Sequence, residues 1–241
     1  MEDTVAEYRK NGFAKVEGLI TREEALHFRA VALDLSRRLS NLSEGSKIFQ
    51  QFVNVWTQDE EMRRLSFHPN AARCAKLLSG MDLRIWHDQI LIKEPGVSKA
   101  TEFHQDQPYW PHSNSPDPIS CWIALGDVGV DSGCMTFIPG RQSRTELAAQ
   151  DLSDPSSMFQ LAPDLVWEPR TTIPLRAGDA TFHHGRCPHM ATPNRSDDPR
   201  VAHTVIFMSA ETRYSGARHV VTDPLQLKAG APLAGEMFPL V

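Results

Sequence analysis

The 241-residue sequence predicts a mainly β fold of the α+β kind, in which helices come first and strands follow. The two predicted helices lie before Gly80, and after it about eight short apolar runs alternate with turns rich in Pro, Gly and Asp. Strands of this kind are typical of a double-stranded β-helix, the jelly-roll or cupin-like barrel, with the N-terminal helices buttressing it. Because 41% of the residues are hydrophobic, one substantial core can form, and we expect residues 1–241 to be a single domain.

Two helices are predicted in the N-terminal part. The first opens with a capping box at residues 21–24 (Thr-Arg-Glu-Glu) and ends before Asn41. The second begins at residues 68–70 (His-Pro-Asn), because Pro is favoured at the first helical position, and it ends at Gly80. Residues 43–60 fit neither a helical nor a strand pattern. The side chains that the two helices would turn toward the core are Ala25, Phe28, Leu33, Leu35, Cys74, Leu77 and Leu78.

Apolar runs bounded by turn residues predict the strands. These runs are residues 13–17, 83–93, 119–125, 135–138, 171–175, 180–184 and 201–209. Residues 141–169 separate two of them; the segment is polar and has a helical tendency at residues 145–149. Long insertions are usually lids or binding loops, so we expect a lid or insert that helps to set substrate choice. A passive connection is the alternative.

Composition excludes several classes of function. The net charge is -5 and no basic block occurs, so we expect no nucleic-acid partner, and no cluster of Lys and Arg suits the phosphates of an acyl-CoA. No apolar run follows Met1 or is long enough to span a membrane, so no membrane partner is expected. The four Cys residues lack C-x-x-C spacing, which indicates reduced thiols and a cytoplasmic location. No apolar stripe indicates a subunit interface, so the oligomeric state is not predicted.

A His and an Asp separated by one residue, His104 and Asp106, are the first candidates for a metal site. On a strand, both side chains would project to one face and the residue between them would point away. Two His and one carboxylate hold non-haem Fe(II) with positions left open, although Mn(II) and Zn(II) also accept these donors. A later His must complete the set. His183, His184 and His189 follow, and the first two, as neighbours on a strand, face opposite sides.

Several segments carry a family resemblance. They are residues 103–111 (FHQDQPYWP), 133–140 (GCMTFIPG) and 189–200 (HMATPNRSDDPR), together with 11–20 and 238–241 at the two ends. In this order the chain resembles, over nearly its whole length, the phytanoyl-CoA dioxygenase family. That family is a branch of the Fe(II)/2-oxoglutarate oxygenases.

The resemblance implies a role for each matched residue. It implies that His104, Asp106 and His189 bind Fe(II), with the segments around His104 and His189 facing each other across the barrel mouth. Arg200 then matches the Arg that grips the distal carboxylate of 2-oxoglutarate, which a guanidinium fork can bind through two hydrogen bonds. The remaining implied contacts are Gln89 and Trp122 with the cosubstrate and His184 in the substrate pocket. Independently of the resemblance, the aromatic residues Tyr109 and Trp110 follow the His104 segment, and we expect them either to line the substrate pocket or to form a hydrophobic plug under the barrel rim.

One position departs from the family pattern. Ala191 stands where the family often has a Ser that hydrogen-bonds the cosubstrate. Thr192 or another polar group then takes its place, or the cosubstrate has one contact fewer. Asp106 is retained, whereas halogenases of the superfamily have Gly or Ala there, so the resemblance disfavours halogenation.

The function implied by the resemblance is an oxygenase that uses Fe(II), 2-oxoglutarate and O2. It would hydroxylate or otherwise oxidise a small-to-medium organic metabolite and release succinate and CO2. An epimerase, desaturase or cyclase with the same three ligands is an alternative. Two further alternatives are a catalytically silent barrel used as a binding module and a Zn-binding cupin-like isomerase, which needs no equivalent of Arg200.

Overall fold

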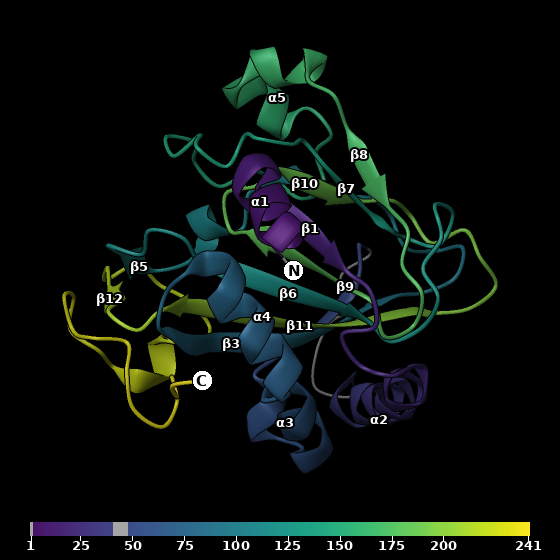
Figure 1. The fold of residues 1–241 in the computed structure, drawn as a ribbon, viewed down its shortest axis with the longest axis horizontal. Helices are drawn as coiled ribbons and strands as arrows, with labels where there is room; N and C mark the ends of the chain where they lie inside the picture. Colours follow the sequence, from purple (N-terminus) through teal and green to yellow (C-terminus); the bar gives the residue numbers. More distant parts are fainter. Residues whose placement is uncertain (1, 41–47) are drawn as a thin grey trace.

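The computed structural model describes residues 2–40 and 48–241, and antiparallel sheets dominate it (Figure 1). A six-stranded sheet contains, in spatial order, β1 (Phe13–Val16), β9 (Ala180–His184), β6 (Ile119–Ala124), β11 (Arg200–Ser209), β3 (Leu83–Lys93) and β2 (Gln50–Val53). A four-stranded sheet contains β4 (Thr101–His104), β10 (His189–Ala191), β7 (Met135–Phe137) and β8 (Thr171–Ile173). The short strands β5 (His112–Ser113) and β12 (Arg213–Tyr214) pair with each other. The mainly β prediction is therefore confirmed.

Helices cover the outer face of the six-stranded sheet. The α-helices are α1 (Glu2–Asn11), α2 (Arg22–Ser40), α3 (Glu60–Ser66), α4 (Pro69–Ser79) and α5 (Ser157–Leu161). The 3-10 helices are η1 (Val55–Thr57), η2 (Gln107–Tyr109), η3 (Pro163–Trp167) and η4 (Asp223–Leu225). In Figure 1, α2, α3 and α4 lie against the six-stranded sheet, whereas α5 lies far from them, beside β8.

Alternation along β11 separates the core from the space between the sheets. Val201, Val205 and Phe207 are buried in the cluster that includes residues of α2 and α4. Arg200 and Thr204, on the opposite face of the strand, line a cavity bounded by both sheets. The arrangement is of the jelly-roll type, but the described strands form two separate ladders and not one closed barrel.

The predicted helix starts and stops are confirmed. In the capping box, Thr21 Oγ1 accepts from Glu24 N–H at 3.1 Å and the Glu24 carboxylate accepts from Thr21 N–H at 2.8 Å. At the start of α4, His68 Nδ1 accepts from Asn70 N–H at 3.2 Å, and Gly80 ends the helix with φ 71°, a conformation that favours Gly.

Some helical predictions are wrong or missing. Leu77 was expected in the core but is 44% exposed, because α4 turns Leu78 (2% exposed) toward the sheet instead. The helices α1 and α3 were not predicted; α3 is short and depends on the Asp59 side chain, which accepts from two N–H groups in its first turn. Of residues 43–60, those up to 47 lie outside the described residues, and β2 and η1 account for most of the rest.

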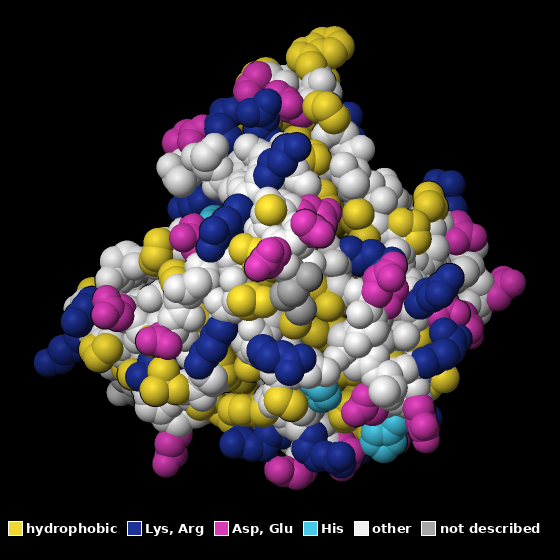
Figure 2. Space-filling model, viewed as in Figure 1, with side chains coloured by type: hydrophobic (Ala, Val, Ile, Leu, Met, Phe, Trp, Pro, Cys, Tyr) yellow, Lys and Arg dark blue, Asp and Glu magenta, His cyan; other side chains and the backbone are white. Residues whose placement is uncertain are grey.

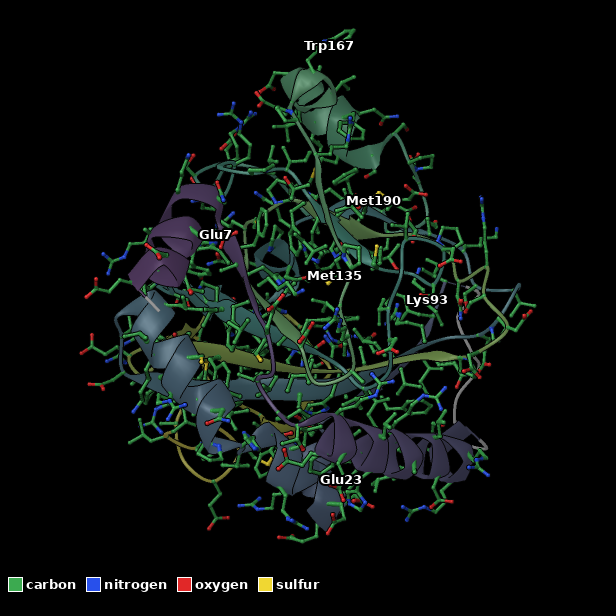
Figure 3. All side chains as sticks on the ribbon, turned by 45° about the vertical axis from the view of Figure 1, so that its right-hand side comes forward. Glu7, Glu23, Lys93, Met135, Trp167 and Met190 are labelled. Atoms are coloured by element: carbon green, nitrogen blue, oxygen red, sulfur yellow. The ribbon has the colours of Figure 1, made fainter. Side chains whose placement is uncertain are left out.

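Residues 141–169 are a packed segment. The expected helix at 145–149 is absent, and the helical residues are instead those of α5 and η3. Leu147, Met158 and Leu165 are buried in one cluster with Phe103, which belongs to β4. Figure 3 shows Trp167 at the outer tip of this segment, far from Met135 and Lys93 in the body of the molecule. The segment is therefore anchored to the four-stranded sheet beside the cavity.

Charges of both signs are interspersed over the face shown in Figure 2, without an extended region of one sign. No helix among the described residues is long and apolar enough to cross a membrane. Cys74, Cys121, Cys134 and Cys187 are all buried and form no disulfide.

The two adjacent leucines of α4 provide a matched test of the fold. We expect Leu78→Ala to lower the free energy of unfolding by about 2–5 kcal/mol, because the truncated side chain leaves a cavity in the core. We expect Leu77→Ala to change it by about 0.5 kcal/mol or less, since its side chain is largely exposed. Urea unfolding followed by circular dichroism measures both; equal losses would contradict the assigned faces of α4.

Candidate metal centre

The pairing of β4 with β10 brings two histidines together. His104 lies directly opposite His189 in this antiparallel pair, and their ring centroids are 4.2 Å apart. Opposite residues project to the same face of a sheet, so both imidazoles enter the space between the sheets. The two segments were expected to face each other across a barrel mouth; they are instead neighbours in one sheet, because β10 pairs with β4 on one side and with β7 on the other.

Backbone carbonyls fix the orientation of both imidazoles. Nδ1 of His104 lies 2.7 Å from the carbonyl oxygen of Glu102, and Nδ1 of His189 lies 3.0 Å from that of Cys187. A carbonyl oxygen only accepts, so each neutral ring carries its proton on Nδ1. The unprotonated Nε2 atoms are then free to bind a metal, as is usual for histidine ligands whose other nitrogen has a backbone partner.

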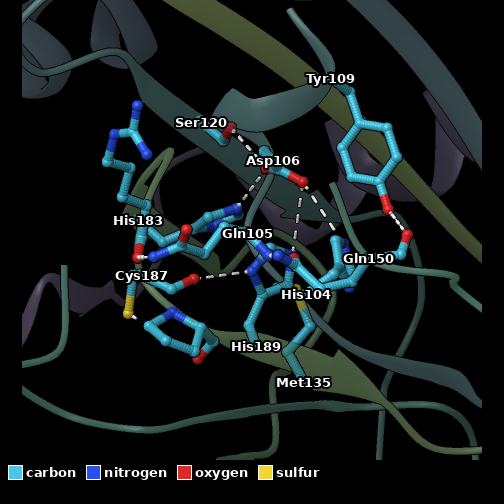
Figure 4. A network of polar contacts seen from close by, with 12 residues as sticks. His104, Gln105, Asp106, Tyr109, Ser120, Met135, Gln150, His183, Cys187 and His189 are labelled. Atoms are coloured by element: carbon cyan, nitrogen blue, oxygen red, sulfur yellow. Dashed lines mark hydrogen bonds and ion pairs between the residues drawn. The ribbon is translucent and has the colours of Figure 1, made fainter. Parts of the chain in front are cut away.

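Asp106 supplies the third ligand atom from a helical turn. It lies beyond the end of β4, at the start of η2, with φ -74° and ψ -43°. The strand argument that placed His104 and Asp106 on one face is therefore wrong beyond His104, and the turn brings the carboxylate back to the site. Oδ1 lies 3.4 Å from Nε2 of His104 and 3.7 Å from Nε2 of His189. The three ligand atoms lie within 4.8 Å of one another (Figure 4).

The second carboxylate oxygen of Asp106 is held by residues of the six-stranded sheet. Ser120 Oγ donates to Oδ2 at 3.3 Å, and His183 Nε2 lies 3.3 Å from the same atom (Figure 4). His184, expected in the pocket, points the other way and pairs with Asp117 at 2.8 Å. Neighbouring side chains on β9 point to opposite faces of the sheet, so only one of these two histidines faces the cavity, and it is His183 and not His184. His184 shares a face with Phe182, which is buried in the helix-side core, and this apolar neighbour was a signal that favoured His183.

The charge states suit a cation. Burial alone would raise the pKa of Asp106, but the imidazoles of His189, His104 and His183 hold it well below its ordinary value. Burial lowers the pKa of His189 to about 3, so its ring is neutral at pH 7. A carboxylate and two unprotonated nitrogens thus face one another as lone-pair donors. This donor set fits Fe(II) and leaves the other positions of an octahedron open.

Cross-strand register stacks the remaining site residues in rows on the six-stranded sheet. Gln89, Thr204, Trp122 and Thr181 lie opposite one another on β3, β11, β6 and β9, and we call them the Thr204 row. A second row lies two residues away from the first on each of these strands. It consists of His87, Ile206, Ser120 and His183, and we call it the Ser120 row. The row containing Ser120 therefore supports Asp106, and the Thr204 row comes next along the cavity.

Arg200 lies at the end of the cavity away from the Ser120 row. It is 5% exposed, and its guanidinium lies over the ring of Trp122 at 5.3 Å. The guanidinium donates a hydrogen bond to the carbonyl of Leu91 at 3.3 Å, and its Nε has no partner within the described part of the chain. Burial lowers the pKa of Arg200 to about 9, which leaves it charged at pH 7. No acidic side chain of the described residues forms an ion pair with it, so an anion is needed to complete this site.

One cavity of about 330 Å³ joins these groups. The candidate ligands, Arg200, Gln89 and Trp122 all line it, and so do Tyr109 and Trp110 as expected. Leu152, from residues 141–169, also lines it, and the Tyr109 hydroxyl donates to the carbonyl of Gln150 in the same segment.

Thr204 was missed by sequence reasoning. Its hydroxyl is buried, lines the cavity and has no hydrogen-bond partner among the described residues. Thr192, considered as the substitute for the Ser absent at Ala191, instead donates its hydroxyl to the carbonyl of Val130. Thr204 lies an even number of residues after Arg200 on the same strand, so both side chains face the same side of the sheet. This alternation could have identified Thr204 from the sequence.

Comparison with known proteins gives the family. A model described as phytanoyl-CoA dioxygenase (PhyH) matches residues 8–202, and the chain belongs to this family. Among curated relatives, the mouse phytanoyl-CoA dioxygenase domain-containing protein 1 is 28% identical over 63% of this chain and 54% of its own length. The human peroxisomal phytanoyl-CoA dioxygenase is 22% identical over 86% of this chain and 68% of its own. The chain thus spans about half of the first relative and about two thirds of the second.

Solved structures resemble the whole chain. The non-haem alpha ketoglutarate dependent carbocyclase SnoK from nogalamycin biosynthesis has 33% identity and a TM-score of 0.89, covering 100% of this chain and 96% of its own. The epimerase SnoN, in complex with Fe3+, alpha ketoglutarate and nogalamycin RO, has 33% identity and a TM-score of 0.84, covering 99% and 97%. EvdO2 from Micromonospora carbonacea, at 22% identity and a TM-score of 0.69, shares the fold.

Metal affinity distinguishes the assigned ligands from their neighbours. We expect His189→Ala to abolish tight Fe(II) binding, and His183→Ala to weaken it about 10–100-fold, because outer-shell partners orient the ligands. We expect His184→Ala to leave the affinity unchanged, since its ring pairs with Asp117 outside the cavity. Anaerobic titration calorimetry with Fe(II) measures all three variants. A loss in His184→Ala equal to that in His189→Ala would contradict the assignment.

Proposed function

We propose that this protein is an Fe(II)- and 2-oxoglutarate-dependent oxygenase that hydroxylates or otherwise oxidises a small-to-medium organic metabolite. The observation that carries the proposal is the buried guanidinium of Arg200, which lacks an acidic partner among the described residues and faces the cavity of the metal centre. A buried cation is unfavourable unless an anion binds it. A dicarboxylate that reaches from the metal to Arg200 satisfies both groups.

Each ligand atom then has a role. Nε2 of His104, Oδ1 of Asp106 and Nε2 of His189 hold Fe(II), and Ser120 and His183 fix the free oxygen of the carboxylate. When bound, iron and 2-oxoglutarate supply the oxidising chemistry with O2, releasing succinate and CO2. The protein's own contribution is to hold the reactants in one geometry and to exclude water from them.

The cosubstrate end is formed by Arg200 and the Thr204 row. Arg200 binds the far carboxylate through its guanidinium fork, and the Trp122 ring beneath it limits its movement. Thr204 donates its unpartnered hydroxyl to the cosubstrate and thereby replaces the Ser that is absent at Ala191. Gln89, opposite Thr204 on β3, lies at the edge of the same region. A silent barrel or a zinc isomerase has no use for this buried cation.

A second outcome is favoured by the similarity to solved structures. The carbocyclase SnoK and the epimerase SnoN match this chain at 33% and 34% identity over 99% or more of its length. The mouse and human relatives named for phytanoyl-CoA dioxygenase match it at 28% and 22% identity over smaller parts of the chain. Epimerisation or ring closure uses the same three ligands and the same cosubstrate. We therefore propose it as the alternative to hydroxylation.

The charge of the cavity favours a neutral substrate. Among the described residues that line it, Arg200 is the sole Lys or Arg, and the cosubstrate occupies it. The phosphates of an acyl-CoA would need further cations. The SnoN structure contains nogalamycin RO, and for this chain we infer a neutral metabolite with a ring system that fits between the aromatic side chains of Tyr109 and Trp110.

Three further expectations stay proposals. Residues 141–169 help to set substrate choice, which is supported by Leu152 in the cavity wall and by the bond from Tyr109 to Gln150. The chain folds as one domain, and it works in the cytoplasm, where its free thiols stay reduced.

Visible absorption tests the site and the cosubstrate together. We expect anaerobic addition of Fe(II) and 2-oxoglutarate to metal-free protein to produce the weak metal-to-ligand charge-transfer band of an iron–oxoacid chelate. His104→Ala and His189→Ala should lack the band, because each removes one ligand, while His184→Ala should keep it. Folded wild-type protein that binds iron without the band would overturn the proposal.

The cosubstrate role of Thr204 has its own test. We expect Thr204→Val to raise the dissociation constant of 2-oxoglutarate about 5–10-fold, the effect of losing one hydrogen bond of about 1 kcal/mol. Thr204→Ser should restore the affinity. Thr172→Val, at an exposed position of β8, is the control. Titration of the charge-transfer band gives each constant, and an unchanged constant in Thr204→Val would show that this hydroxyl does not contact the cosubstrate.

A further inference from the structure

Two imidazoles line the cavity at the end opposite to Arg200. His87 belongs to the Ser120 row on β3, and His219 comes from the loop before η4; their ring centroids are 5.9 Å apart and the rings are inclined by 30°. The register partner of His87 on β11 is Ile206, which lies about 20 Å along the strand from Arg200 at about 3.3 Å per residue. The histidine pair is therefore separate from the cosubstrate end.

The surroundings of the pair are mostly aromatic, with the buried imidazole of His112 close to both rings, and they keep the pair neutral although Asp106 acts in the opposite direction on His87. Trp86 contacts both rings, at centroid distances of 5.6 Å from His87 and 5.1 Å from His219, while Trp110 and Val220 line the same end of the cavity. Burial, and then the neighbouring His219, lower the pKa of His87 to about 3, and burial lowers that of His219. Two neutral rings at the end of a cavity can form hydrogen bonds without adding charge.

Backbone partners give the two rings complementary hydrogen-bonding roles. Nδ1 of His219 accepts from Val221 N–H at 3.2 Å, so the proton of this neutral ring is on Nε2. Nδ1 of His87 lies 3.4 Å from the carbonyl oxygen of Asp88, which places its proton on Nδ1 and leaves Nε2 as an acceptor. Neither Nε2 atom has a partner within residues 2–40 and 48–241. The pair therefore offers one donor and one acceptor.

We propose that His87 and His219 bind a hydroxyl group on a ring of the substrate, His219 donating to its oxygen and His87 accepting its hydrogen. A hydroxyl is the group that both donates and accepts at one atom. A carboxylate would need two donors or a cation, and an ammonium group would need more acceptors than one. This inference rests on the proposed function, because it names the substrate class of the same site: a neutral, hydroxylated ring compound, held with its hydroxyl beside Trp110 and Val220.

The test compares two probes that differ at one group. 2-Naphthol has a hydroxyl, whereas 2-methoxynaphthalene keeps the oxygen as an acceptor and lacks the donor. Equilibrium dialysis against anaerobic protein loaded with Fe(II) and 2-oxoglutarate measures their binding without turnover. We expect 2-naphthol to bind about tenfold more tightly than its ether, the effect of one hydrogen bond to a buried partner.

Variants separate the contributions of the two rings. His87→Phe and His219→Phe keep a ring but remove its nitrogens. His87→Phe should abolish the preference for 2-naphthol, whereas His219→Phe should weaken the binding of both probes about equally, because both keep the oxygen that accepts from Nε2 of His219. His87→Gln and His219→Gln place an amide near the position of Nε2, and each should restore most of what the corresponding Phe variant loses. His27→Phe is the matched control, because this exposed histidine pairs with Glu61 outside the cavity.

The outcomes separate this inference from the proposed function. The charge-transfer band in each variant shows that the protein is folded and that iron and 2-oxoglutarate are bound. With the band present, equal or undetectable binding of the two probes overturns the inference alone. A preference that persists in His87→Phe, or binding of both probes that His219→Phe leaves unchanged, also overturns it, because the hydroxyl then binds elsewhere, for instance at the metal. Absence of the band in the wild type overturns the proposed function instead.

Discussion

The antiparallel pairing of β4 with β10 is the constraint on which the candidate site depends. It sets His104 opposite His189, and backbone carbonyls two residues before each histidine then hold the rings with Nε2 toward the cavity. A shift of this register by one residue would turn one ring to the other face of the sheet. The packing of β10 between β4 and β7 and the cluster beneath residues 141–169 resist such a shift.

The side chains that the six-stranded sheet turns toward the cavity change in charge from one end of the cavity to the other. Arg200 supplies a buried positive charge at one end, the Thr204 row supplies uncharged polar groups, and the Ser120 row supports the negative charge of Asp106. Because a strand rises about 3.3 Å per residue, side chains two positions apart form successive rows along the cavity. In the proposed function, this order separates the anionic cosubstrate at the Arg200 end from the neutral substrate at the end of the Ser120 row.

Local sequence patterns correctly predicted the elements whose structure depends mainly on residues close in the sequence. Strands 83–93 and 180–184 have the predicted bounds, and the capping box at 21–24 forms as expected. Features that depend on distant contacts were not predicted. The short helix α3 is amphipathic over too few residues to give a clear period, and the turn at Asp106 follows from packing against β6 and β9. Which of two adjacent histidines faces the cavity likewise depends on the sheet that covers β9.

The position of Asp106 outside the β ladder has a consequence for divergence within the fold. Its side chain reaches the metal from a 3-10 turn, so the ladder between β4 and β10 does not include it. A lineage, or a protein engineer, can exchange this residue and thereby alter the number of protein ligands while the strand pairing that carries both imidazoles stays intact. His104 and His189, in contrast, are themselves paired residues of that ladder. The carboxylate is therefore the modular member of the three ligands.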